Sequence, residues 1–303
     1  AYLRSLEGPW VIKTDGLAAG KGVLVASTIA EAEADVVEKL SGAAFGEAGR
    51  RIVIEAGLSG TECSVQALCD GNKVVPLAPA RDFKRLSDRD VGPNTGGMGA
   101  YSPLPELSEG LVGRVIDEAI EPVVAELRRR GIDYRGVLYA GIMLTADGPM
   151  VLEFNARFGD PEAQVVLPRL AEDPVAVMMS VARGRLASAP RFSPDAAVCV
   201  VQAAEGYPGV AGPAQWIPGL GPDGQLANPI PGVTIVHAGT SRGETGEYRT
   251  SGGRVLGVTA LAPTLAEARR RAYVAAEQTG WPGCQYRRDI AEEAVTMSEA
   301  SAR

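Results

Sequence analysis

Acidic, amide and basic side chains alternate along one short stretch, VLEFNARFGDPEAQ, which begins at Val151. Its apolar start favours a strand, and the two-residue period of a strand would place Glu153, Asn155 and Arg157 on one face. Carboxylate and amide oxygens about 7 Å apart along a strand can share one Mg²⁺ ion and its waters. The guanidinium of Arg157 would suit a phosphate or a carboxylate. This face is therefore predicted to bind a metal and an anion.

The alternative for this strand is an edge whose polar face is simply solvated. A tight turn that contains two further carboxylates, Asp160 and Glu162, follows directly before an apolar run. A solvated edge does not require such crowding of polar groups, so the turn favours a functional site.

A second polar cluster lies in VIKTDGLAAGKGV, near the beginning of the sequence. The pattern predicts two strands, Trp10–Lys13 and Val23–Val25, joined by a glycine-rich loop. Glycine lets backbone amides approach phosphate oxygens closely, and Lys13 and Lys21 supply positive charge in an acidic chain. The loop is not a Walker A motif, because Gly22 stands where that motif needs Ser or Thr. A phosphate-covering loop and an ordinary hairpin tip both remain open at this point.

The composition argues against several classes of protein. The 303 residues carry a net charge of −7 and no basic run longer than Arg128–Arg130, so neither nucleic acid nor an anionic membrane is an expected partner. Four cysteines without a C-x-x-C pair and the single histidine, His237, are too few for a zinc site and argue against a histidine-dependent nucleophile. We expect reduced core cysteines and a structural His237. Without an 18-residue apolar run or a signal-peptide pattern, a cytoplasmic protein is expected.

Periodicity predicts a mixed α and β organisation. Helices are expected from Thr28 to Leu40 and from Ser108 to Gly131, the second kinked at Pro122, and strands at Arg51–Glu55, Cys63–Cys69, Lys73–Pro79, Val137–Leu144 and Met150–Asn155. The second and third of these strands are expected to pair as a hairpin through Asp70–Asn72, and the last two to pair across Ala146–Pro149. From about Pro190, strands at Ala196–Ala203, Thr234–Ala238 and Arg254–Leu261 and a helix capped by Thr264 predict a separate small α+β domain. The segment from Arg81 to Pro103 is expected to be a long loop that is either functional or disordered, and Ala291–Arg303 a frayed tail.

The stretch EFNARFGDPE resembles the signature of the phosphoribosylamine–glycine ligase family of ATP-grasp enzymes. VIKTDGLAAGKGV, DVGPNTGGMGAYSP and GGRVLGVTAL resemble three further blocks of that family, in the family's order, and the resemblance extends from about Pro9 to Ile290. It implies an α+β (α/β) ATP-grasp fold, with a lid subdomain at residues 1–65, a main subdomain at 66–190, a C-terminal α+β domain at 191–290 and a flexible tail at 291–303. It also implies a reaction of purine biosynthesis, in which ATP, 5-phosphoribosylamine and glycine give glycinamide ribonucleotide, ADP and phosphate through a glycyl phosphate.

The resemblance also implies roles for individual residues. ATP would be bound by Lys13, Gly20, Lys21, Gly22, Glu55, Leu58 and Glu62. The substrates glycine and 5-phosphoribosylamine would be placed by Asn94, Thr95, Gly96, Gly97, Met98, Gly99 and Asp160. Catalysis would involve Asp82, Lys84 and Arg157, and Mg²⁺ or Mn²⁺ would be held by Glu153 and Asn155.

The chain departs from the family pattern at three places. Ala56 and Gly57 stand where the family usually has Glu and Phe at the adenine hinge, and the strand Tyr139–Met143 lacks the second Glu of many ATP-grasp metal sites. The α/β domain with a glycine-rich phosphate loop that begins the family's members is absent from this sequence. Two alternatives therefore stay open, namely another ATP-grasp carboxylate–amine ligase and a truncated ATP-binding remnant without full turnover. The chain is expected to be a monomer or to associate with the missing N-terminal domain.

Overall fold

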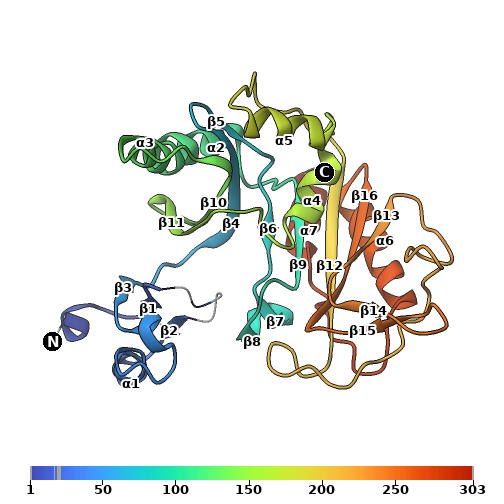
Figure 1. Cartoon of the computed structure of the whole chain (residues 1–303), viewed down its shortest axis with the longest axis horizontal. Coiled ribbons are helices and arrows are strands. Elements are labelled where there is room, and N and C mark those ends of the chain that lie inside the picture. The colour runs from blue at the N-terminus through green and yellow to red at the C-terminus, as the bar shows by residue number, and fades with distance from the viewer. Residues whose placement is uncertain (1, 17, 19–21, 302–303) are drawn as a thin grey trace. The chain divides into compact units, whose positions relative to one another are not determined.

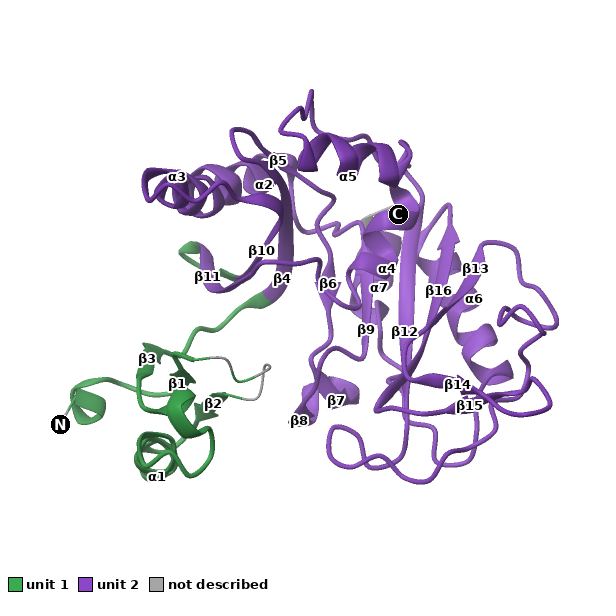
Figure 2. Cartoon of the chain, viewed as in Figure 1, with its two compact units in different colours: residues 1–61, 143–148 green, residues 62–142, 149–303 purple. Residues whose placement is uncertain are grey.

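The computed structural model describes residues 2–16, 18 and 22–301 of the chain (Figure 1). The chain divides into two compact units, Ala1–Thr61 with Met143–Gly148, and Glu62–Ile142 with Pro149–Arg303 (Figure 2). The finer limits predicted at residues 65, 190 and 290 stay predictions.

The first unit is a small sheet with one helix. Its antiparallel strands follow the order β2 (Val23–Ala26), β1 (Trp10–Thr14) and β3 (Ile52–Ala56), and α1 (Ile29–Leu40) packs against β1 and β2. Short 3₁₀ turns lie at Tyr2–Ser5 and Gly46–Gly49. The predicted capping box is confirmed, because Thr28 accepts from the amide of Glu31 while the Glu31 carboxylate accepts from the amide of Thr28. The core of this unit contains one buried apolar residue from each of the first 3₁₀ turn, β1, β2 and α1: Leu3, Ile12, Ala26 and Ala32.

A four-stranded sheet begins the second unit, in the order β11 (Gly148–Asn155), β10 (Arg135–Thr145), β4 (Thr61–Asp70) and β5 (Val74–Pro76). The predicted hairpin at the end of β4 is confirmed, since Asp70 Oδ1 accepts from the amides of Asn72 and Lys73 in the turn. The predicted neighbours β10 and β11 are confirmed as well.

The expected helix from Ser108 to Gly131 is present but is not uniformly α-helical. It consists of α2 (Glu109–Val115), a π-helical turn at Ile116–Ile120 and α3 (Glu121–Arg129). The amide of Glu121 donates five residues back, to the carbonyl of Ile116. Pro122 follows at once and has no amide hydrogen for the ordinary bond to the carbonyl four residues earlier, so the π turn occurs where the α-helical ladder is already broken.

The second sheet joins distant parts of the sequence. Its order is β13 (Val233–His237), β16 (Arg254–Ala262), β12 (Ala196–Ala203), β9 (Gly99–Ser102) and β6 (Arg81–Asp82), and α6 (Leu265–Gln278) packs against β12 and β16 (Figure 1). The three predicted C-terminal strands and the helix are confirmed. The sheet nevertheless takes two strands from before residue 190, so the C-terminal segment does not complete its own sheet.

The prediction of one long loop from Arg81 to Pro103 is wrong. Besides β6 and β9, this segment contains a hairpin of β7 (Arg85–Ser87) and β8 (Val91–Asn94) around a 3₁₀ turn at Asp88–Asp90. The strands β6 and β9 are short and have no clear alternation, and β9 is specified by pairing with β12 almost a hundred residues later. Local sequence patterns cannot show such a pairing.

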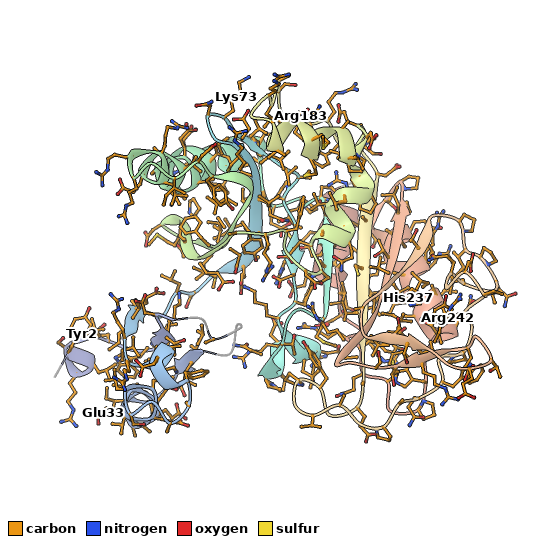
Figure 3. The ribbon with its side chains drawn as sticks, in the orientation of Figure 1. Tyr2, Glu33, Lys73, Arg183, His237 and Arg242 are labelled. Atoms are coloured by element: carbon orange, nitrogen blue, oxygen red, sulfur yellow. The ribbon has the colours of Figure 1, made fainter. Side chains whose placement is uncertain are left out.

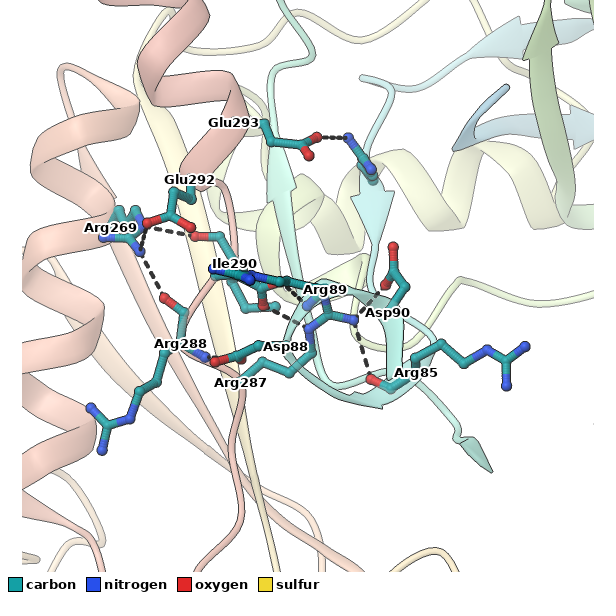
Figure 4. Close-up of polar contacts among 12 residues, drawn as sticks. Arg85, Asp88, Arg89, Asp90, Arg269, Arg287, Arg288, Ile290, Glu292 and Glu293 are labelled. Atoms are coloured by element: carbon teal, nitrogen blue, oxygen red, sulfur yellow. Dashed lines mark hydrogen bonds and ion pairs between the residues drawn. The ribbon is translucent and has the colours of Figure 1, made fainter. Parts of the chain in front are cut away.

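The remaining elements are short helices and one hairpin: α4 (Ala163–Val166), a 3₁₀ turn at Leu167–Arg169, α5 (Pro174–Ala182), α7 (Glu292–Ser301), β14 (Thr240–Arg242) and β15 (Tyr248–Thr250). The helix α7 occupies most of the segment that was expected to be a frayed tail. The segment before α7 is held by Arg287, which is 1% exposed and donates to the carboxylates of Asp289 and Asp90 and to the carbonyl of Arg85 (Figure 4). Periodicity missed this anchor because two of its partners, Asp90 and Arg85, lie about 200 residues away.

The cysteines and the histidine have the expected structural settings. All four cysteines are free, and Cys63, Cys69 and Cys199 are buried. His237, labelled in Figure 3, is the last residue of β13. One ring nitrogen lies 2.9 Å from Thr240 Oγ1 and the other 2.8 Å from the carbonyl oxygen of Gly224. These partners fit a histidine that stabilises a turn.

Candidate active site

A lysine surrounded by carboxylates marks the candidate site in the second unit. Lys84 forms an ion pair with Glu62 on β4, and its Nζ lies 4.0 Å from Glu153 Oε1 on β11. Burial lowers the pKa of Lys84, but Asp82 and Glu62 outweigh that effect, and the net pKa lies above the ordinary lysine value. Asp82, Glu62 and Glu153, which were expected at the catalytic, ATP and metal positions, are thus brought together around one ammonium group.

The two expected metal ligands are neighbours on β11. Asn155 Nδ2 donates to Glu153 Oε1 at 3.2 Å, so the two side chains meet on one face of the strand. Within residues 2–16, 18 and 22–301, no group of three or more His, Cys, Asp or Glu residues has the arrangement of a metal site. A cation here would thus rest on Glu153, Asn155 and oxygens of a bound ligand, which is a coordination that Mg²⁺ commonly accepts.

Arg157 does not share the strand face with these ligands. The strand β11 ends at Asn155, and Arg157 lies exposed beyond it, with Nη1 donating to the carbonyl of Phe158 at 2.7 Å. The expectation of three alternating side chains on one face is therefore correct for two of them. The strand ends early because the chain turns at Ala156 toward Gly159.

Asp82 is the most constrained carboxyl group of the site. It is 9% exposed, and its Oδ1 has no hydrogen-bond partner among the described residues. Burial raises the pKa of Asp82 well above its ordinary value, the nearby carboxylate of Glu162 raises it further, and Lys84 opposes both effects. The group is therefore easier to protonate than an ordinary aspartate.

Glu162 extends the site into the protein through two hydroxyl groups. It is 2% exposed, and its Oε1 accepts from Ser64 Oγ at 2.7 Å. Ser64 Oγ lies 2.9 Å from Tyr139 OH, and because the Ser64 proton points to Glu162, Tyr139 donates to Ser64. Burial raises the pKa of Tyr139, which keeps that proton in place. The sequence pattern alone did not predict these hydrogen bonds. The two-residue period of β4 places Ser64 on the same face as Glu62, however, and could have indicated that Ser64 also faces the site.

The titration of Asp82 gives a testable effect on stability. An acid whose pKa is raised by folding binds its proton more tightly in the folded chain, while the unfolded chain loses that proton near pH 4, since a free aspartate has a pKa of about 3.9. The free energy of unfolding of wild type should therefore fall relative to that of Asp82→Asn as the pH rises above about 4. Each kcal/mol of difference in this free energy should raise the Tm of the variant above that of wild type by roughly 2–4 °C. Denaturation curves from pH 4 to 8 measure this difference, with the exposed Asp117→Asn as the control. A difference that does not change with pH would contradict it.

The backbone amides of the expected substrate loop donate hydrogen bonds to other groups of the protein. The amide of Thr95 donates to the carbonyl of Lys84, that of Gly96 to Tyr207 OH, that of Gly97 to Thr95 Oγ1 and that of Met98 to the carbonyl of Phe83. The side chain of Met98 is completely buried. In this structure each of these four amides already has a protein acceptor, and the expected role of this loop in placing a substrate stays a prediction.

The outer residues of this group have equally structural settings. Asn94 ends β8 opposite Arg85, and Gly99 begins β9 opposite Val200. Asp160 forms an ion pair with Arg254, with Nη2 to Oδ2 at 2.7 Å, rather than presenting a free carboxylate.

The remaining expected nucleotide ligands belong to the first unit. Lys13 on β1 forms an ion pair with Glu55 on β3 at 2.6 Å, although the two were expected at the phosphates and the adenine. Leu58 is half-buried in the connector after β3, and Gly22 accepts from the amide of Thr14 across the hairpin. Gly20 and Lys21 lie outside the residues that the structure describes.

Comparisons with known proteins agree over nearly the whole chain. The family model of the phosphoribosylglycinamide synthetase ATP-grasp (A) domain matches residues 1–163, and that of the C domain matches residues 197–293. A phosphoribosylamine–glycine ligase of Caulobacter vibrioides is 48% identical over 297 residues, which cover 97% of this chain and 68% of that relative. One of Escherichia coli O6:H1 is 46% identical over 301 residues, which cover 99% and 69%.

Solved structures show the same relationship. The crystal structure of the phosphoribosylamine–glycine ligase of Thermotoga maritima has a TM-score of 0.82 at 36% identity, covering 96% of this chain and 71% of that one. The biotin carboxylase domain of 2-oxoglutarate carboxylase from Hydrogenobacter thermophilus has a TM-score of 0.66 at 20% identity, covering 94% and 60%, and this shows the ATP-grasp fold alone. The resemblance read from the sequence motifs is confirmed, and the chain belongs to the phosphoribosylglycinamide synthetase family.

Proposed function

We propose that this chain catalyses the ATP-dependent ligation of glycine to 5-phosphoribosylamine, which gives glycinamide ribonucleotide, ADP and phosphate in purine biosynthesis. The observation that carries the proposal is the arrangement of Glu62, Lys84 and Glu153 beside Asn155, in a chain of this family. A ligase of this kind depends on positioning and charge neutralisation more than on a nucleophilic side chain. An ammonium group between carboxylates, next to oxygen ligands for a cation, suits that demand.

The roles of the residues follow from their settings. Glu153 and Asn155 would hold Mg²⁺ or Mn²⁺, which when bound neutralises negative charge on the phosphates of ATP. Lys84 is held cationic by Glu62 and Asp82, so it can stabilise the phosphoryl group while that group passes to the glycine carboxylate. The exposed guanidinium of Arg157 is free of carboxylate partners among the described residues and would bind the glycine carboxylate or the transferring phosphoryl group.

The second step requires a proton acceptor. The amine of 5-phosphoribosylamine displaces phosphate from the glycyl phosphate and must then lose a proton. Asp82 has a carboxyl group with a raised pKa and an oxygen without a hydrogen-bond partner among the described residues. Such a carboxyl group is a better proton acceptor near neutral pH than an ordinary aspartate. Asp82 is thus assigned the acceptor role, with Glu162 next to it.

Nucleotide binding is the first property to test. At ATP near 100 times its dissociation constant, binding to the folded chain alone should stabilise it by about 2.7 kcal/mol. For a cooperative unit of roughly 200 residues, this corresponds to a rise in Tm of about 5–10 °C, which thermal melts with and without Mg²⁺-ATP would measure. ATP with a chelator is the control, and an unchanged Tm with Mg²⁺ present would count against the nucleotide site.

Turnover is tested separately, as ADP released in the presence of glycine and freshly generated 5-phosphoribosylamine. Product formation supports the ligase, whereas a melting shift without product leaves a nucleotide-binding protein. Omitting glycine is the control, because ADP released without it would be simple ATP hydrolysis.

The other expectations concern the protein's surroundings. No helix among the described residues is long and apolar enough to cross a membrane. A cytoplasmic location, a monomeric state or association with a further domain, and small-molecule substrates without a nucleic-acid partner remain proposals, supported by the net charge of −7 and by the family.

A further inference from the structure

Arg254 connects two segments, at Gly96 and at Asp160, that the family resemblance assigns to the substrate site. It is the first residue of β16, and 23% of its side chain is exposed. Its Nη1 donates to the carbonyl of Gly96 at 2.7 Å and to the carbonyl and Oδ1 of Asp160, both at 3.1 Å, while Nη2 donates to Asp160 Oδ2 at 2.7 Å. One rigid guanidinium thus binds a loop carbonyl, a turn carbonyl and both oxygens of a carboxylate. A lysine could not reproduce this arrangement, because its ammonium is a single point of charge.

Tyr207 reaches the same loop from the same end of the sheet. Its hydroxyl accepts from the amide of Gly96 at 2.8 Å, so Gly96 is held on both its amide and its carbonyl side. The strand β12 has a register irregularity at Gln202 and Ala203, where Ala203 pairs with Arg254. A bulge re-aims the side chains at the end of a strand pair, and here that end presents the two residues that hold the loop.

The loop packs too closely for a larger residue. A Cβ on Gly96 would lie 3.0 Å from Arg254 Cζ, and one on Gly97 would lie 2.4 Å from Pro161 Cδ. Gly97 also has a φ of 108°, in the region that favours glycine. The loop is therefore fitted between Arg254 on one side and the Asp160–Pro161 turn on the other.

We propose that Arg254 is a positioning residue that fixes the loop Thr95–Met98 against the turn Gly159–Glu162. This inference rests on the proposed function, because it makes the C-terminal sheet responsible for the geometry of the substrate site. Arg254 acts through the loop and need not contact a substrate. Misplacement of a substrate by about 1 Å can cost about 100-fold in rate, so the loss of such a contact should be measurable.

Three variants and one control test the assignment. Arg254→Ala removes all the hydrogen bonds of the guanidinium, and Arg254→Lys keeps the positive charge. Tyr207→Phe removes only the hydroxyl that accepts from the amide of Gly96. The control is Arg271→Ala, since Arg271 has a nearly equal side-chain exposure of 22% and likewise binds a carboxylate, Glu267, and a carbonyl, Pro231, but on α6. Hydrogen exchange of the amides of Thr95–Met98 is measured first, because it does not depend on activity.

Arg254→Ala should speed exchange at Gly96 and Gly97 at least about tenfold and leave the Mg²⁺-ATP melting shift unchanged. In the turnover assay it should raise KM for glycine or 5-phosphoribosylamine at least about tenfold, with KM for ATP unchanged. Arg254→Lys should fall between wild type and Arg254→Ala, Tyr207→Phe should speed exchange mainly at Gly96, and Arg271→Ala should match wild type in every measurement.

Unchanged exchange in Arg254→Ala would overturn the assignment. If KM also rose in that case, Arg254 would contact the substrate itself. If wild type failed to bind Mg²⁺-ATP, the proposed function would fail, whereas the exchange measurement would still decide whether Arg254 holds the loop.

Discussion

Glu153→Gln is expected to lower the Mg²⁺-dependent affinity for ATP at least about 100-fold, which corresponds to about 2.7 kcal/mol. Glu153 is the only carboxylate of the two ligands on β11, and a neutral amide is a poorer ligand for a hard divalent cation. The change also leaves Lys84 with one fewer anionic neighbour, so the positive charge near the cation is less well balanced. Folding should be nearly intact, because 46% of the Glu153 side chain is exposed and the substitution keeps its shape.

Calorimetry with ATP and increasing Mg²⁺ measures this effect. Glu118→Gln serves as the matched control, since Glu118 also pairs with one cation, Arg114 at 2.9 Å, in the same unit but in the helical segment Glu109–Arg129, which contributes no residue to the candidate site. An affinity that stays the same in Glu153→Gln would remove this residue from the metal site.

Lys84→Met should affect both turnover and stability. Loss of the ammonium leaves Asp82, Glu62 and Glu153 without their common cation, and breaking a buried ion pair on one side typically costs about 3–5 kcal/mol of stability. Because 29% of the Lys84 side chain and 31% of the Glu62 side chain are exposed, solvent should hold the loss to the lower end of that range. Turnover should fall at least about 100-fold, since a positioned charge at the phosphoryl group is lost.

A second substitution separates the two effects. Adding Asp82→Asn to Lys84→Met removes the most deeply buried of these three carboxylates and should restore much of the stability, measured by urea denaturation. Turnover should stay below that of Asp82→Asn alone, which is the reference because Asp82 is itself assigned the proton-acceptor role. Lys39→Met is the control for stability alone, because Lys39 is 2% exposed and pairs with Asp35 in the first unit. Recovery of turnover together with stability in the double variant would show that Lys84 has only a structural role.

Local elements could be predicted from the sequence because their causes are local. The helix α1 starts at Thr28 because the capping groups are three residues apart, and β4 and β5 form a hairpin because Asp70 satisfies the turn amides. The contact between Glu153 and Asn155 could be predicted for the same reason, since the two residues are two positions apart on one strand. The family resemblance then supplied the roles that such patterns cannot.

The interior of the site could not be predicted in this way. Lys84 meets Glu62 across 22 residues, Ser64 meets Glu162 across 98, and Arg254 meets Asp160 across 94. These pairs depend on how β4, β6 and β16 are placed by their sheets, which is a property of tertiary pairing. The acceptor of the Gly96 amide, Tyr207, likewise lies 111 residues away along the chain.

The second sheet contains strands from distant parts of the sequence, and this has a consequence for folding during synthesis. The strands β6 and β9 leave the ribosome about a hundred residues before β12, and more than 150 before β16, with which they must share a sheet. Until then, β9 is an edge without its partner, and non-local pairing of this kind is slow to form and open to wrong associations. The first unit, by contrast, takes its sheet from the first 56 residues. During synthesis, the strands β1, β2 and β3 can thus pair early, whereas the loop at Gly96 gains its final shape only after Arg254 has been translated.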